Sequence, residues 1–235
     1  MMFSVKIDGS VLVVTGASSG IGEAIARLAH ARGAKVVLAA RRAGLLSEVA
    51  ASLPGAVAVP ADVTSAVDVA ALVRRAVEEF GRIDVLVNNA GQGLHLPVID
   101  VDLDDVRAVL ELNVLAPLAL MKAVAPVMRS GGGGAIVNIS SGSTRRVLPG
   151  VGPYAATKSA LNTLTEVARA ELARDNIVVS LVVPGVTKTA FHDVLRAGSA
   201  DVTHAPKCTP EEVAEAVLAV IESGDPEIVV SPVHR

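Results

Sequence analysis

Seven short apolar runs, separated by longer segments of helical periodicity, constrain the fold of this chain more than any other feature. The runs are VLVVTG (11–16), KVVLAA (35–40), AVAVPA (56–61), IDVLVN (83–88), GAIVNIS (134–140), IVVSLVV (177–183) and EIVVS (227–231). Runs of this length predict strands, and helices of the size between them predict right-handed crossovers. The pattern therefore predicts an α/β fold with a mostly parallel seven-stranded sheet and helices on both faces.

The composition fits such a sheet. Of 235 residues, 51% are hydrophobic and only 2% are aromatic, so the core must be built from Ala, Val, Leu and Ile. These residues suit strands that helices bury on both faces. Because no Pro- or Ser-rich linker divides the chain, we predict one domain over 1–235. The weakly patterned segment 186–206 is predicted to be a mobile substrate loop within it.

Charge, cysteine content and the N-terminal sequence exclude several classes of protein. A formal net charge of -3 gives no basic footprint for nucleic acid. Cys208 is the only cysteine, which predicts no intrachain disulfide and a reducing compartment. No apolar stretch reaches the roughly 18 uninterrupted residues typical of a membrane span, and MMFSVKIDGS has no targeting pattern. We expect a cytoplasmic protein without membrane or nucleic-acid partners.

A glycine-rich turn follows the first strand directly, in TGASSGIGEAIARLAHARG. Gly16, Gly20 and Gly22 would let the backbone approach a pyrophosphate closely, and the following helix N-terminus favours that anion. The spacing differs from the common G-x-G-x-x-G pattern. A glycine turn that only packs a helix against a sheet is the alternative.

The end of the second strand bears on the choice of dinucleotide. A cofactor with a free ribose 2′-hydroxyl usually meets an acidic residue here, whereas a 2′-phosphate prefers arginine. Ala40 occupies the position of the acid, and Arg41 and Arg42 follow it. Guanidinium groups form forked hydrogen bonds with phosphate. The stretch favours NADP(H) over NAD(H), the alternative being two solvated charges.

The single tyrosine of the chain, Tyr154, stands four residues before Lys158 in GPYAATKSALN. Residues at this spacing share one face of a helix. A phenol has an ordinary pKa of about 10, and a nearby cation is expected to lower it. The pair therefore indicates a proton donor and acceptor. A buried structural tyrosine followed by a surface lysine would have the same sequence pattern and is the alternative.

Six motifs together resemble the short-chain dehydrogenases/reductases: TGASSGIG, NNAG (88–91), LELNVLAP around Asn113, NISS, YAATK and VVPGVTKT. They occur in that family's order and spacing from residue 11 to about 190. The resemblance implies a Rossmann-type doubly wound sheet and metal-free hydride transfer with a nicotinamide cofactor. It also implies a homodimer or homotetramer joined through helices at about 102–128 and 153–174.

The resemblance also implies roles for individual residues. Tyr154, Lys158, Ser141 and Asn113 match the catalytic positions, with Ser140 a weaker claimant to the serine position and Asn113 expected to anchor a water that relays protons. The residues predicted to contact the cofactor are Gly16, Ser18, Ser19, Gly20, Ile21, Gly22, Arg41, Arg42, Asp62, Val63, Asn89, Ala90, Gly91, Tyr154, Lys158, Pro184, Gly185, Thr187 and Thr189.

The sequence thus predicts an oxidoreductase that transfers hydride between NADP(H) and a carbonyl or secondary alcohol, with the tyrosine as general acid and base. A non-enzymatic NADP(H)-binding sensor is the alternative of another class. A 3-ketoacyl-thioester reductase is the alternative within the family, although the ending EIVVSPVHR lacks the "xVDGG"-like tail of many such reductases. The histidines share no metal-like spacing.

Side chains near the predicted site leave further alternatives open. His95 and His192 are expected either to face the substrate or to lie on the surface. Arg145 and Arg146 are expected either to select an anionic substrate or to be solvated charges.

Overall fold

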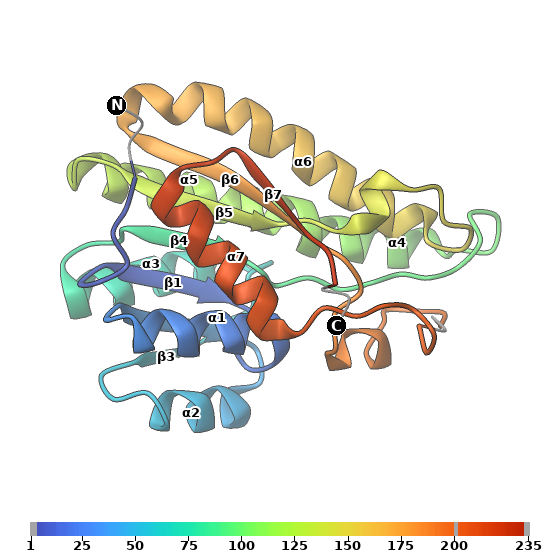
Figure 1. The fold of residues 1–235 in the computed structure, drawn as a ribbon, viewed down its shortest axis with the longest axis horizontal. Coiled ribbons are helices and arrows are strands. Elements are labelled where there is room, and N and C mark those ends of the chain that lie inside the picture. The colour runs from blue at the N-terminus through green and yellow to red at the C-terminus, as the bar shows by residue number, and fades with distance from the viewer. Residues whose placement is uncertain (1–3, 200–201, 233–235) are drawn as a thin grey trace.

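All seven predicted strands form one sheet in the computed structural model, which describes residues 4–199 and 202–232 (Figure 1). The strand order is β3-β2-β1-β4-β5-β6-β7, and every pairing is parallel. The strands are β1 (Val11–Thr15), β2 (Lys35–Ala40), β3 (Val57–Pro60), β4 (Val85–Asn88), β5 (Gly134–Ile139), β6 (Ile177–Pro184) and β7 (Glu227–Val230). The predicted fold class is confirmed, and no strand end differs from prediction by more than two residues.

Helices cover both faces of the sheet. They are α1 (Gly20–Ala31), α2 (Ala43–Ala51), α3 (Ala66–Phe80), α4 (Leu103–Leu110), α5 (Ala116–Ser130), α6 (Gly152–Leu172) and α7 (Pro210–Ser223). Short helical segments are η1 (Glu111–Leu115), η2 (Gly142–Arg145), η3 (Ala173–Asp175) and η4 (Ala190–Asp193). The chain order reverses between β1 and β4, so the loops at the carboxyl ends of these strands flank a crevice.

Alternation along the strands divides the core into two layers. In β1, Leu12 and Val14 pack with α1, α2 and α7, whereas Val11 and Val13 pack with α3 and α5 on the other face. All four are at most 1% exposed. Because each buried Val or Leu stabilises the fold by roughly 1.5–3 kcal/mol relative to exposure, the aliphatic core holds the sheet rigid beneath its loops.

The helix predicted over 102–128 is one continuous helical segment, Leu103–Ser130, with a π-helical turn at η1. By length and composition it is apolar enough to cross a membrane, but half of its apolar window is buried inside the protein. Leu120, Val124 and Met128 pack against the sheet, as expected of a core helix. Leu103 and Leu115 of the same segment are 64% and 48% exposed. These outward side chains are compatible with the predicted subunit interface, which stays a prediction.

The segment predicted as a substrate loop, 186–206, connects β6 to α7, and its described residues contain only η4 as regular structure. Residues 200–201 of it lie outside the described residues. It lies against the stretch after β4, because the Arg196 amide donates to the Gly93 carbonyl at 2.8 Å and the His95 amide donates to the Ala197 carbonyl at 3.1 Å. The loop therefore forms a wall of the crevice, and its mobility stays a prediction.

Candidate active site

A cavity of about 1270 Å³ opens at the carboxyl ends of the strands. Residues from the loops after β1, β2, β3, β4, β5 and β6 line it together. The predicted site residues in its lining are Gly16, Ser18, Ser19, Gly20, Ile21, Arg41, Arg42, Asp62, Val63, Asn89, Ala90, Gly91, Ser141, Tyr154, Lys158, Pro184, Gly185, Thr187 and Thr189. Of the predicted set, only Gly22 and Asn113 are absent from the lining. Both lie behind the wall of the cavity, where they position other residues.

The glycine turn forms one end of this cavity. Gly16 and Gly20 have φ values of +66° and +58°, the left-handed region in which a side chain is strained. A Cβ atom at Gly22 would lie 2.6 Å from Asn89 Nδ2, so no side chain fits there. Gly22 therefore lets α1 pack against the sheet, the alternative role of such a turn, while Gly16 and Gly20 shape the cavity wall.

Thr15 and Asn89 fix the turn to the neighbouring strand. The Thr15 hydroxyl accepts hydrogen bonds from the backbone amides of Asn89 and Ala90, each at 3.0 Å. The Asn89 side-chain amide donates to the Thr15 carbonyl at 2.8 Å. Sequence reasoning missed Thr15, which is 1% exposed. Its position at the end of a buried strand is the only sequence signal that marks it.

The two arginines after β2 have different environments. Arg42 donates to the Ser19 hydroxyl at 2.6 Å and to the Ser18 hydroxyl at 3.0 Å, so it braces the glycine turn. Arg41 is exposed and lines the cavity, and its positive charge interacts with the carboxylate of Asp62. Burial raises the pKa of the Asp62 carboxyl, but hydrogen bonds from Thr64 and the Arg41 charge outweigh it, and the net pKa is lowered. The cavity is thus cationic where β2 ends.

Ser141 and Tyr154 lie together at the centre of the cavity wall. The Ser141 Oγ accepts hydrogen bonds from the Ser143 amide at 3.2 Å and the Ser143 hydroxyl at 3.0 Å, and it is hydrogen-bonded to Tyr154. The Ser140 hydroxyl instead donates to Asn162 Oδ1 on α6 at 2.6 Å. This arrangement favours Ser141 over Ser140 as the serine that acts with the tyrosine.

Burial controls the ionisation of Tyr154. The side chain is 7% exposed, and desolvation raises the pKa of its phenol to about 12, although the hydrogen bond with Ser141 lowers it in part. The expectation that Lys158 lowers this pKa is therefore wrong for the protein alone. The reason is desolvation, which dominates the pKa of the buried phenol, while Lys158 Nζ lies 6.0 Å from the Tyr154 ring centroid. Tyr154 is protonated at neutral pH.

Lys158 lies one turn along α6 from Tyr154 and is 5% exposed. Its Nζ donates to the Ile139 carbonyl at 2.9 Å. Burial lowers the pKa of Lys158 to about 8. The alternative of a surface lysine is excluded by this burial. The ammonium is therefore easier to deprotonate than that of an ordinary lysine.

Asn113 supports the loop beside the lysine. Its Oδ1 accepts from the Gln92 amide at 3.0 Å, and its Nδ2 donates to the Gln92 carbonyl at 2.9 Å and to Thr157 Oγ1 at 3.0 Å. The residue lies in the π-helical turn η1 and is fully buried. A Cβ atom at Gly91 would lie 3.1 Å from Asn113 Oδ1 and 3.4 Å from Lys158 Nζ. Asn113 therefore positions the loop after β4, and these contacts leave its predicted water-anchoring role a prediction.

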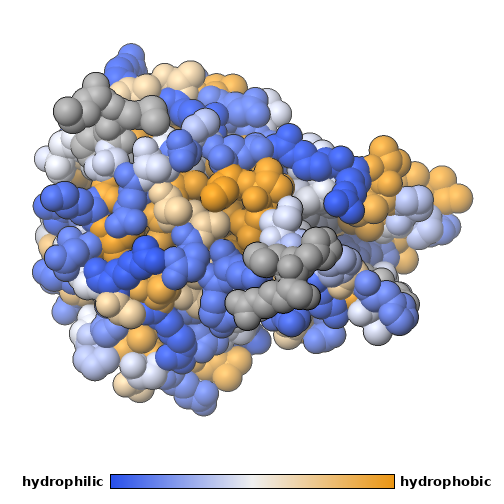
Figure 2. All heavy atoms as spheres, in the orientation of Figure 1, coloured by the Kyte–Doolittle hydropathy of each residue, from blue (hydrophilic) through white to orange (hydrophobic). Residues whose placement is uncertain are grey.

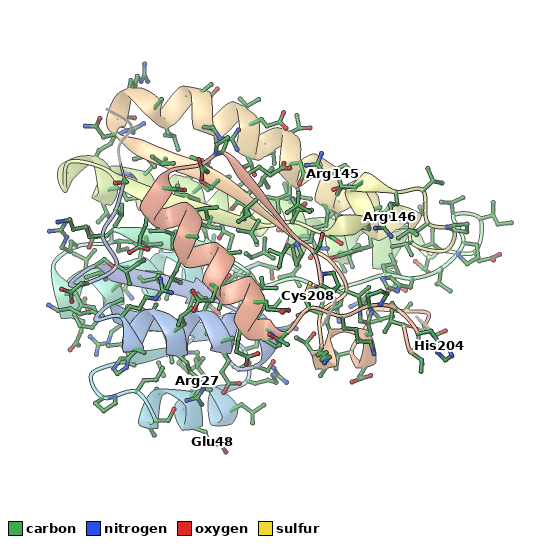
Figure 3. The ribbon with its side chains drawn as sticks, viewed as in Figure 1. Arg27, Glu48, Arg145, Arg146, His204 and Cys208 are labelled. Carbon is green, nitrogen blue, oxygen red and sulfur yellow. The ribbon has the colours of Figure 1, made fainter. Side chains whose placement is uncertain are left out.

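The structure decides some of the alternatives that the sequence left open for the histidines and arginines near the site. His95 is 9% exposed and lines the cavity with His192, so a surface position is excluded for His95. Arg145 forms an ion pair with Glu227 at 2.5 Å. Arg145 and Arg146 extend from the loop after β5 near the cavity rim (Figure 3). The ion pair satisfies Arg145 within the protein.

The pKa of Lys158 predicts how stability depends on pH. Between pH 8 and 10.5 the unfolded chain keeps this proton while the folded protein releases it, so the free energy of unfolding should rise with pH. Lys158 can contribute at most about 3 kcal/mol to this rise in the free energy of unfolding. Above pH 10 the raised pKa of Tyr154 acts in the opposite direction, because the folded state then binds more protons.

Urea denaturation at several pH values from neutral to about 10 measures this slope. Lys158→Met should flatten the rise, whereas Lys122→Met, at an exposed lysine on α5, should leave it unchanged. Equal slopes in the wild-type and Lys158→Met proteins would contradict the assignment.

Comparison with known proteins identifies the class to which this fold and site belong. The sequence profile of the short chain dehydrogenases matches residues 10–200. An uncharacterized oxidoreductase of Staphylococcus aureus (strain MRSA252) is 37% identical over 214 residues, which cover 90% of each chain. The chain therefore belongs to the short-chain dehydrogenase/reductase family and is an oxidoreductase of that family.

Two solved structures of the family show the same fold in complexes with different cofactors. A 7α-hydroxysteroid dehydrogenase complexed with NADH and 7-oxoglycochenodeoxycholic acid has a TM-score of 0.89 and 30% identity, and the match covers 96% of this chain and 94% of that one. A short chain dehydrogenase from Burkholderia cenocepacia J2315 in complex with NADP has a TM-score of 0.85 and 35% identity, covering 97% and 90%. Similarity alone thus leaves both nicotinamide cofactors open.

Proposed function

We propose that this oxidoreductase transfers hydride between NADP(H) and a carbonyl or secondary alcohol, with Tyr154 as the general acid and base. The observation that carries the proposal is the hydrogen-bonded Ser141–Tyr154 pair in the wall of the cavity, with buried Lys158 one turn away. The glycine turn lines the same cavity, so a bound dinucleotide and a substrate would share one space.

The protein's part in this reaction is to place hydrogen-bond donors around the reacting oxygen. The nicotinamide supplies or accepts the hydride when it is bound. Tyr154, protonated at neutral pH, would donate its proton to the oxygen as negative charge develops there. Ser141 would donate a second hydrogen bond, because its own oxygen already accepts from Ser143. Lys158, which is still mainly protonated at neutral pH because its pKa is about 8, would then supply a proton to the phenolate and itself become a neutral amine.

The residues around the turn fit a dinucleotide with a 2′-phosphate. Gly16 and Gly20 leave the turn without side chains, and Arg42 orients two serine hydroxyls there. Ala40 puts no carboxylate at the end of β2, and Arg41 extends an exposed guanidinium beside the cavity. These features support the choice of NADP(H).

Arg41→Ala should weaken NADPH binding by about 10–100-fold, the range of one lost charge-assisted hydrogen bond, and should change NADH binding little. Arg42→Ala should weaken both cofactors, because Arg42 also braces the turn. Fluorescence titration with each reduced cofactor measures the effect. Arg27→Ala is the control, since Arg27 pairs with Glu23 on α1 away from the cavity (Figure 3). Equal losses for NADH and NADPH in Arg41→Ala would contradict the phosphate role.

The cavity rim favours a substrate with an apolar part. Val98 and Val147, next in sequence to the lining residues Pro97 and Leu148, are 69% and 97% exposed, so apolar surface adjoins the cavity. Figure 2 shows hydrophobic residues gathered at the right-hand end of the molecule. Leu96 and Leu148 continue it into the cavity. These side chains would contact carbon groups next to the reacting carbonyl.

The experiment that tests the proposal measures oxidation of NADPH with a panel of ketones and aldehydes, alongside NADH. Turnover that favours NADPH would support the enzyme and its cofactor together. The sensor alternative is favoured instead if NADPH binds tightly and no carbonyl compound on the panel is reduced. A strong preference for ketoacyl thioesters over simple ketones would identify the alternative within the family.

A further inference from the structure

A pair of histidines faces the catalytic tyrosine from two segments about a hundred residues apart. The ring centroid of His95 lies 5.9 Å from that of Tyr154 and 5.8 Å from that of His192. Phe191 completes the group, with its ring 5.8 Å from Tyr154. All four side chains line the cavity. The histidines therefore border the space in which the reacting carbonyl would lie.

The backbone holds His95 firmly in this position. Its amide donates to the Ala197 carbonyl at 3.1 Å, and it forms a parallel bridge with Gly198. Gln92 Nε2 donates to the Val194 carbonyl at 3.0 Å, and the Arg196 amide donates to the Gly93 carbonyl at 2.8 Å. The loop that carries His192 is thus fastened to the loop that carries His95.

The imidazoles nevertheless lack hydrogen-bond partners. Among the residues that the structure describes, neither ring nitrogen of His95 has one, and neither has His192 Nδ1, although all three atoms are buried. His95 is only 9% exposed. Because a buried polar group without a partner is costly, these nitrogens indicate a ligand group that completes them.

The protonation states of His95 and His192 determine which chemical groups of a ligand they can hydrogen-bond. Burial and the neighbouring His192 lower the pKa of His95. Burial also lowers the pKa of His192, with Asp193 raising it and Lys207 lowering it further. Both rings are therefore neutral at pH 7. A neutral imidazole has one donor and one acceptor nitrogen, which suits a hydroxyl or carbonyl group better than a carboxylate.

We infer that His95 and His192 form a specificity subsite for a second, uncharged oxygen on the substrate, close to the reacting carbon. The inference rests on the proposed function and names its substrate class: hydroxy ketones, diketones and the corresponding diols. The apolar rim would contact the rest of such a molecule.

The test compares kcat/KM for 3-hydroxy-2-butanone, 2-butanone and 2-oxobutanoate with NADPH. The informative quantity is the hydroxyketone-to-ketone ratio relative to wild type, because the intrinsic reactivity of the two carbonyls cancels in it. His95→Leu should lower this ratio by about 10–100-fold, since the variant lacks the polar partner. His95→Gln, which keeps a donor and an acceptor, should restore much of it.

The matched control is His204→Leu. His204 is exposed at the outer side of the same loop and is absent from the cavity lining (Figure 3). It should leave the ratio at the wild-type value. An unchanged ratio in His95→Leu, or a wild-type preference for 2-oxobutanoate over both other ketones, would overturn the inference.

A binding measurement separates failure of this inference from failure of the proposed function. Calorimetric titration of Tyr154→Phe protein, loaded with NADPH, with 3-hydroxy-2-butanone needs no turnover. Adding His95→Leu should weaken this binding by the same factor that lowers the ratio. Equal affinity in the two proteins would overturn the subsite even if ketones are reduced. A loss of affinity would support it even if wild-type turnover were absent.

Discussion

Tyr154→Phe should reduce kcat by roughly 10²–10⁴-fold, the range that a positioned proton donor contributes. The ring and its contacts with His95 and Phe191 are retained in phenylalanine, so only the hydroxyl and its hydrogen bond with Ser141 are lost. The pKa of about 12 means that the wild-type phenol carries its proton at neutral pH. Stopped-flow or steady-state oxidation of NADPH with the best ketone of the panel measures the loss.

The dissociation constant for NADPH serves as the control for this variant. It should change far less than kcat, because Tyr154 is only one of many residues predicted to contact the cofactor, whereas its phenol alone is assigned to proton transfer. Turnover near the wild-type rate would refute the acid–base role, and a parallel loss of NADPH binding would show that the variant damages the cavity instead.

Ser141→Ala should reduce kcat by roughly 10²–10³-fold, as expected when one donor to a developing oxyanion is removed. The Ser141 oxygen is held by two hydrogen bonds from Ser143, which direct its own proton away from that residue. Alanine fits the same space and leaves Ser143 without its acceptor. The loss should appear mainly in kcat, since the bond strengthens as charge develops.

Ser140→Ala is the matched control, one residue away on the same strand end. Its hydroxyl donates to Asn162 on α6, so the expected effect is about 1 kcal/mol of stability with little change in kcat. Thermal denaturation and kinetics measured on both variants separate the two serines. A larger loss of kcat from Ser140→Ala than from Ser141→Ala would reverse the assignment.

Much of the fold follows from local pattern. The five central strands are apolar on both faces, and a parallel sheet with helices on each side buries them, whereas the edge strands β3 and β7 stay partly exposed. Gly16 and Gly20 have positive φ values, which is why glycine marks the turn in the sequence. The Tyr154–Lys158 spacing places both side chains on one helix face.

Only the tertiary structure decided which residues meet and how they ionise. The resemblance favoured Ser141 over its neighbour Ser140, and the packing of α6 against β5 supplies the physical reason, since Ser140 bonds Asn162 and Ser141 bonds the tyrosine. The direction of the pKa change at Tyr154 was predicted wrongly, because charge proximity can be guessed from spacing whereas desolvation depends on the whole fold. The position of His95 beside His192 likewise depends on pairing between segments a hundred residues apart. The sequence alone thus determined the family, the sheet and the chemical side chains. Burial and long-range contacts decided how these side chains ionise and which of them meet in the cavity.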